Sequence, residues 1–168
     1  MPFAIASFGN LLFPYAVPRK QLFIARWLLV LCWMGVIFSA SGDQMSFDRS
    51  RHIIGSFLCW LVPQLSPEAI HAVVVVLRKC AHVAEYAVLA WLIWWALDQF
   101  SVSRAPDWPW PKAGLVLTLV TLYAISDELH QTFIPSRGGC VQDVLLDTLG
   151  GALGLLVLWA ACRLKKRE

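Results

Sequence analysis

Four long runs of apolar residues dominate the chain, and each is close to the length that a helix needs to cross a bilayer. The runs cover residues 22–40, 72–97, 113–134 and 141–162. A spanning helix needs about 20 consecutive, mainly apolar residues. The pattern therefore predicts an all-α fold, an integral membrane bundle of about four transmembrane helices.

Shorter segments lie between and before these runs. Residues 52–65 are apolar but too short to span, and the prolines at 63 and 67 bound them, which favours a helix lying in the interface. The link over residues 98–112 combines three prolines with two tryptophans, a composition that suits a turn at the level of the lipid head groups.

The same pattern divides the chain into three parts. Residues 1–21 are apolar, but their basic pair follows the hydrophobic stretch, which is the reverse of a secretory signal. We interpret them as an N-terminal interfacial arm. Residues 22–162 form the predicted membrane domain, and residues 163–168 form a basic tail.

The distribution of lysine and arginine predicts the orientation, because cytoplasmic loops carry the excess of positive charge. One set of connecting segments is rich in these residues and the other set is poor. The rich set holds Arg19, Lys20, Arg26, Arg104, Lys112, Arg163, Lys165, Lys166 and Arg167, and the poor set holds Arg49, Arg51 and Arg137. Both termini are therefore predicted to be cytoplasmic.

The overall composition agrees with a bilayer as the solvent. The chain is 58% apolar and 15% charged, whereas soluble domains average about 45–50% apolar and about 25% charged. This excludes an ordinary cytosolic enzyme and a disordered chain. A net charge of +3 is too small to indicate a nucleic-acid partner, so the expected partners are membrane lipids. The five cysteines form no metal-binding pattern.

Polar residues interrupt three of the four runs, and the predicted topology places all of them in the outer half of the membrane. At about 100° per residue, Arg78, His82 and Glu85 share one face of the second helix. The other polar positions singled out in these helices are Lys79 and Tyr86 in the second run, Asp127, Glu128, His130 and Gln131 in the third, and Asp143 and Asp147 in the fourth. A Gly150-x3-Gly154 spacing continues the fourth stripe and allows a neighbouring helix to approach closely.

Ionisable residues in a bilayer are costly, so they normally face the protein interior or a water-filled cavity. They could simply hold the helices together, but eight charged groups exceed what three helices need, and a site explains the set better. The predicted substrate-binding residues are Arg78, Lys79, Tyr86, Glu128, Gln131, Arg137 and Asp147, and the acid and base candidates are His82, Glu85, Asp127 and Asp143.

The chemistry of this predicted site stays open between three alternatives. Arg78, Lys79 and Arg137 could hold a phosphate or carboxylate head group. A chain of ionisable side chains could instead relay protons, as in transporters. A divalent cation is the third alternative, because His82-x2-Glu85 and Asp143-x3-Asp147 each place possible ligands on one helical face. No residue is assigned as a metal ligand, and the cofactor is left open.

At these residues the chain resembles the VanZ-like family of small bacterial membrane proteins, named for a member linked to teicoplanin resistance. The resemblance extends over about residues 25–160. It rests on Phe38-Ser39-Ala40-Ser41, Arg78-Lys79-x-x-His82-x3-Tyr86-x-x-Leu89, Asp127-Glu128-x-x-Gln131-x-Phe133-x-Pro135-x-Arg137 and Asp143-x3-Asp147-x-x-Gly150-x3-Gly154. Two positions depart from the family pattern: Ser136 stands where glycine is frequent, and Asp147 stands where asparagine is common.

The resemblance implies a multi-pass protein of the bacterial plasma (inner) membrane and of the cell envelope. Our leading hypothesis is an outer-leaflet polar pocket that binds an envelope lipid or a lipid-linked precursor head group, with an influence on teicoplanin susceptibility. A proton- or ion-coupled transporter and a structural or partner-binding scaffold are the alternatives. Whether bond chemistry occurs is left open.

Overall fold

Every regular element of the described chain is a helix. The computed structural model describes residues 18–42, 47–98, 108–134 and 138–165. Its helices are α2 (Arg19–Ala40), α3 (Phe47–Leu61), α4 (Pro67–Leu97), α5 (Trp110–Gln131) and α6 (Val141–Lys165). No strand occurs in these ranges, so the all-α prediction is confirmed.

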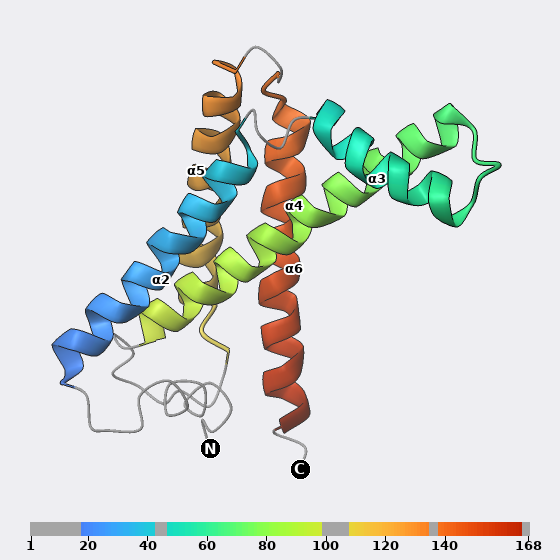
Figure 1. Ribbon diagram of the computed structural model, residues 1–168. Helices are drawn as coiled ribbons and strands as arrows, with labels where there is room; N and C mark the ends of the chain where they lie inside the picture. Colours follow the sequence, from blue (N-terminus) through green and yellow to red (C-terminus); the bar gives the residue numbers. More distant parts are fainter. Residues whose placement is uncertain (1–17, 43–46, 99–107, 135–137, 166–168) are drawn as a thin grey trace.

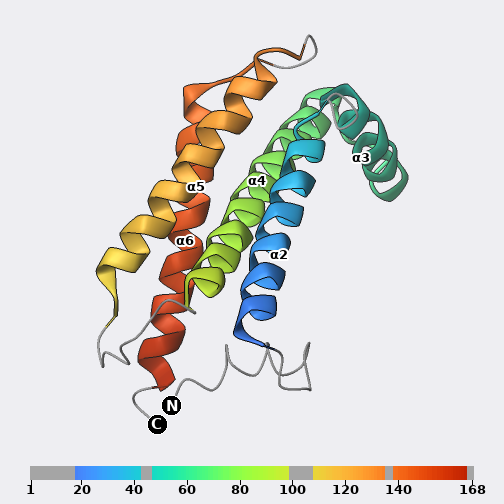
Figure 2. The same ribbon diagram turned by 90° about the vertical axis from the view of Figure 1, so that its left-hand side faces the viewer.

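The four longer helices form a bundle in which the chain direction alternates (Figures 1 and 2). Helices α2 and α5 run toward one end, and α4 and α6 run toward the other, so α2 begins at the end where α6 finishes. Helix α4 is the central element, because α2, α3, α5 and α6 all contact it. The short helix α3 folds back on the first part of α4, which projects from the bundle (Figure 1).

Helix α4 begins earlier than the apolar run predicts, at Pro67 rather than near residue 72. The hydroxyl of Ser66 accepts a hydrogen bond of 3.2 Å from the backbone N–H of Ala69 and so caps the helix. Proline suits the first position of a helix, and an acidic residue, here Glu68, suits the first turn. The proline that was expected to close the preceding segment therefore opens α4, and α3 ends at Leu61.

Two glycines bring α6 into backbone contact with α4. A Cβ atom on Gly150 would lie 2.6 Å from the carbonyl oxygen of Val83, and one on Gly154 would lie 2.6 Å from that of Ala87. Only the absence of a side chain permits this approach, because the obstructing atoms belong to backbone and cannot rotate away. The close approach predicted from the Gly150-x3-Gly154 spacing is confirmed.

The inside and the outside of the bundle are both apolar. Val30, Leu89, Val120 and other apolar side chains form the core, while large apolar side chains such as Leu31 and Val157 are 58% and 66% exposed on the outer faces. A water-soluble monomer rarely exposes so much apolar surface. This surface is typical of a helix bundle that contacts lipid.

Two of the described helices are long and apolar enough to cross a membrane by length and composition. They are α2, over Arg19–Ala40, and the part of α6 over Val141–Leu164. Helices α4 and α5, which occupy the other two predicted spans, carry most of the polar residues and are not among them. The expectation of four spans is therefore not confirmed by this criterion.

Candidate functional site

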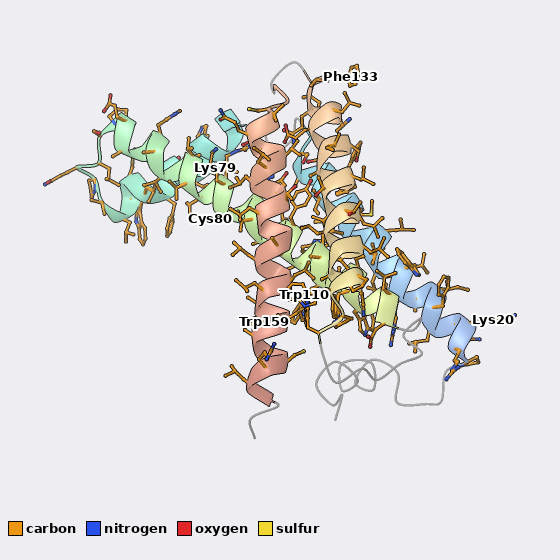
Figure 3. The ribbon with its side chains drawn as sticks, turned by 180° about the vertical axis from the view of Figure 1, so that it is seen from behind. Lys20, Lys79, Cys80, Trp110, Phe133 and Trp159 are labelled. Carbon is orange, nitrogen blue, oxygen red and sulfur yellow. The ribbon has the colours of Figure 1, made fainter. Side chains whose placement is uncertain are left out.

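The buried polar side chains of the described residues gather at one end of the bundle, where α2 and α5 end and α6 begins. They are Ser41, Asp127, Glu128, Gln131 and Asp147. We call this set, together with His82 of α4, the acidic end. In Figure 3 it lies toward the labelled Phe133 and Lys79, and away from Trp159. The polar residues of three helices thus lie together at one end of the bundle.

Asp127 receives hydrogen bonds from two different helices on a single oxygen. The hydroxyl of Ser41 donates to Asp127 Oδ2 over 2.7 Å, and Gln131 Nε2, one turn further along α5, donates to the same atom over 3.1 Å. Asp127 is only 1% exposed, and its second oxygen, Oδ1, has no hydrogen-bond partner. One oxygen of this carboxylate is therefore fixed in place by hydrogen bonds, and the other is not.

Glu128 is held on both oxygens by N–H groups. Gln131 Nε2 donates to Oε1 over 3.0 Å, and the backbone N–H of Cys140 donates to Oε2 over 2.8 Å. Gly139 permits this second bond, because a Cβ there would collide with the backbone oxygen of Glu128 and with the side chain of Thr132. Two N–H donors stabilise the ionised form of a carboxylate.

Asp147 is fully buried and faces His82 across the α4–α6 contact. Asp147 Oδ1 lies 3.3 Å from His82 Nδ1, which is within ion-pair distance when the imidazole is protonated. The two groups are not well aligned for a hydrogen bond, and both oxygens of Asp147 are without a hydrogen-bond partner. A buried carboxylate without hydrogen-bond donors is costly, and a protonated His82 beside Asp147 would offset part of this cost.

The three buried carboxylates form one cluster. Asp127, Glu128 and Asp147 each offer an oxygen, and these oxygens all lie within 4.8 Å of one another. Like charges at this separation repel strongly in a medium of low dielectric constant. His82 forms an ion pair with Asp147, one member of the cluster, when its imidazole is protonated.

The other predicted site residues lie around the cluster rather than in it. Lys79 Nζ is 3.6 Å from Asp143 Oδ1, and both side chains are exposed by more than a third. Arg78 and Glu85 are half-buried on α4. Tyr86 is completely buried, and its hydroxyl has no hydrogen-bond partner.

The structure thus separates the predicted residues into two groups. Asp127, Glu128, Gln131 and Asp147 meet, with His82 beside them, whereas Lys79 and Asp143 form a separate pair at the rim. Arg137, which was predicted to bind an anion, lies outside the described residues.

Ser41 is not among the site residues predicted from the sequence. In the structure it is 2% exposed and supplies the hydroxyl that fixes Asp127. The available signal was its position: it ends the first apolar run at the same predicted depth as the acidic residues of the third. Cys140 contributes its backbone N–H to the site.

One family model matches the chain. It is described as VanZ/LLP1, and it matches residues 23–163, which include every helix residue named above for the acidic end. Among curated proteins no significant match is found, and none is found among solved structures.

Proposed function

The chain belongs to the VanZ/LLP1 family, and on that premise we propose that it binds the anionic head group of an envelope lipid or lipid-linked precursor. The pocket would lie in the outer leaflet of the bacterial plasma membrane. The observation that supports this most is the acidic end itself, a polar site built by four helices of an otherwise apolar bundle and flanked by Arg78 and Lys79.

The proposal includes four membrane spans, formed by α2, α4, α5 and α6. Their alternating direction in the bundle supports this arrangement, and so do the exposed apolar side chains on their outer faces, such as Leu31, Leu122 and Val157. Helix α4, with 31 residues, is about 46 Å long at 1.5 Å per residue. It can cross the hydrocarbon region and still extend beyond it.

The rim of the site offers cations to an anionic head group. The side chain of Lys79 is 53% exposed, and its partner Asp143 is also accessible, so an incoming phosphate can compete for the ammonium group. Arginine and lysine are the usual protein ligands of phosphate. Behind them, His82 lies between the accessible rim and the buried Asp147, where it can accept or release a proton.

The core below the acidic end argues against the transporter alternative. A proton or ion path would need polar groups along the bundle, whereas the described buried polar residues all belong to the acidic end. The apolar side chains of Leu89, Val120 and Leu155 occupy the middle of the bundle. We therefore favour binding at one face of the membrane over transport across it.

The test of the proposal is lipid binding by variants at the rim. In nanodiscs, we expect Lys79→Met and Arg78→Gln to weaken the binding of a polyprenyl phosphate at least fivefold, because each removes a cation. The matched control is Lys20→Met, since Lys20 is exposed at the opposite end of the bundle (Figure 3). Equal affinity in wild type, both rim variants and the control would refute head-group binding and leave the scaffold alternative.

The outer-leaflet location has its own test. In a background without native cysteines, Gly138→Cys should react with a membrane-impermeant maleimide from outside the cell, because the position is exposed and open. Lys20→Cys should react only after permeabilisation. The reverse pattern would invert the topology and place the pocket in the cytoplasmic leaflet.

A link to glycopeptides predicts that expression of the protein changes teicoplanin susceptibility in a host cell.

A further inference from the structure

We propose that Asp127, Glu128 and Asp147 bind one hard divalent cation of the Mg²⁺, Mn²⁺ and Ca²⁺ class. The inference concerns the buried cluster of the acidic end, and it does not depend on which lipid, if any, binds at the rim. Its basis is that the cluster has the donor atoms, the size and the negatively charged groups that such an ion requires.

The first observation is the shortage of hydrogen-bond donors inside the cluster. Asp147 Oδ2 and Asp127 Oδ1 have no hydrogen-bond partner, and Asp147 Oδ1 faces the imidazole of His82 at 3.3 Å, although the two residues are 0% and 1% exposed. Buried carboxylate oxygens are nearly always hydrogen-bonded or bound to a metal. Two oxygens without a partner in one cluster, on different helices, indicate a shared ligand.

The second observation is the size of the cluster. The three residues offer oxygens that all lie within 4.8 Å of one another. Ca²⁺ binds oxygen at about 2.3–2.6 Å and Mg²⁺ at about 2.0–2.1 Å, so opposite ligands of one ion lie about 4–5 Å apart. The oxygens can therefore reach a common ion with little movement.

The hydrogen bonds around the cluster orient the ligand atoms. Ser41 and Gln131 hold Asp127 by Oδ2, which leaves Oδ1 as the atom offered to the ion. Gln131 and the backbone N–H of Cys140 each donate a hydrogen bond to Glu128 and so orient its carboxylate. Such outer contacts fix carboxylates that bind metals. A ligand set made of oxygens alone selects hard cations over soft ones.

The charge balance also fits a divalent ion. Asp127, Glu128 and Asp147 bring three carboxylates into one buried volume. A divalent cation placed among them would offset most of the mutual repulsion of these groups.

The test is a titration of the purified protein with Mn²⁺, in detergent and after removal of metals by a chelator. Binding abolishes the paramagnetic resonance signal of free Mn²⁺, so the bound ions can be counted directly. We expect one Mn²⁺ per chain in the wild type, displaced by excess Ca²⁺. Asp147→Asn should weaken the binding at least tenfold, because it replaces a charged ligand by a neutral group of the same shape.

The matched control is Asp143→Asn, one turn earlier on α6. Asp143 is a carboxylate at the rim that pairs with Lys79 and does not belong to the cluster, so the affinity should change less than twofold. The unfolding temperature of the wild type, measured with and without Mn²⁺, gives a second readout that needs no variant and should rise with the ion. No saturable binding by the wild type, or equal losses in the two variants, would overturn the proposal.

Discussion

The two ends of the bundle both carry charged side chains, yet they differ in how these are paired. We call the second one the tryptophan end; it consists of Arg26, Trp94, Trp95, Asp98, Trp108, Lys112 and Trp159. Lys112 forms an ion pair of 2.9 Å with Asp98 and lies 4.1 Å above the ring of Trp94. At the acidic end, three carboxylates face one partly buried histidine.

The atoms that remain without a hydrogen-bond partner sharpen this contrast. At the tryptophan end they are N–H groups: Arg26 Nε and the indole nitrogens of Trp95 and Trp159. At the acidic end most of them are carboxylate oxygens. Tryptophan and paired cations are typical of the membrane interface, and their role here is to anchor the bundle. Acceptors without donors serve no anchoring purpose, so the acidic end is where we place the function.

The largest effect is expected where α4 and α6 approach each other beside the acidic end. Gly150→Val should lower the free energy of unfolding by about 3 kcal/mol, because the new side chain collides with the backbone of Val83 and forces the helices apart. Thermal unfolding in detergent measures this. Gly114→Val is the matched control, since a Cβ at Gly114 meets nothing within 4 Å. Equal losses in the two variants would show that the close approach does not hold the acidic end together.

A smaller loss is expected from the hydroxyl that fixes Asp127. Ser41→Ala should lower the free energy of unfolding by about 2 kcal/mol, because it removes a hydrogen-bond donor from Asp127. That carboxylate is too deeply buried for water to take the place of the hydroxyl. The same unfolding measurement applies. The control is Ser39→Ala: its hydroxyl is exposed and donates to Gly35 of its own helix, so the change should stay within about 0.5 kcal/mol. If the two alanine variants lose the same free energy of unfolding, the hydroxyl of Ser41 serves only the end of its helix and has no special role in the site.

The residues differ in how well the sequence predicts their roles. The apolar runs predict four of the five helices in the described part of the chain, and the Gly150-x3-Gly154 spacing predicts the α4–α6 contact. Both predictions depend only on local sequence. The start of α4 was missed because Pro67 terminates one segment and equally well begins another. Asp147 lies with Asp127 and Glu128, whereas Asp143 lies at the rim. This difference depends on how α6 is rotated about its own axis relative to α5, and the sequence pattern of a single helix does not define that rotation.

Asp147→Asn sharpens the comparison, because here removing a charge should stabilise the protein. In the presence of a chelator, the variant should gain about 1 kcal/mol, since it relieves repulsion among three carboxylates that lie close together. His82, which is 20% exposed, can lose its proton and leaves no stranded charge. Unfolding temperatures of wild type and variant in chelator measure the gain. A loss of stability in chelator would mean that the His82–Asp147 pair outweighs the repulsion.

The smallest effect, of opposite sign, is expected for the corresponding change at the tryptophan end. Asp98→Asn should cost about 0.5 kcal/mol, because Asp98 is half exposed and its pair with Lys112 is screened by solvent. The loss should disappear in about 1 M salt, where the screening length falls to about 3 Å. The free energy of unfolding of wild type and variant, measured at low and at high salt, tests both the loss and its disappearance. A gain in stability, as expected for Asp147→Asn, would mean that Asp98 too is an uncompensated acid and that the two ends do not differ in charge pairing.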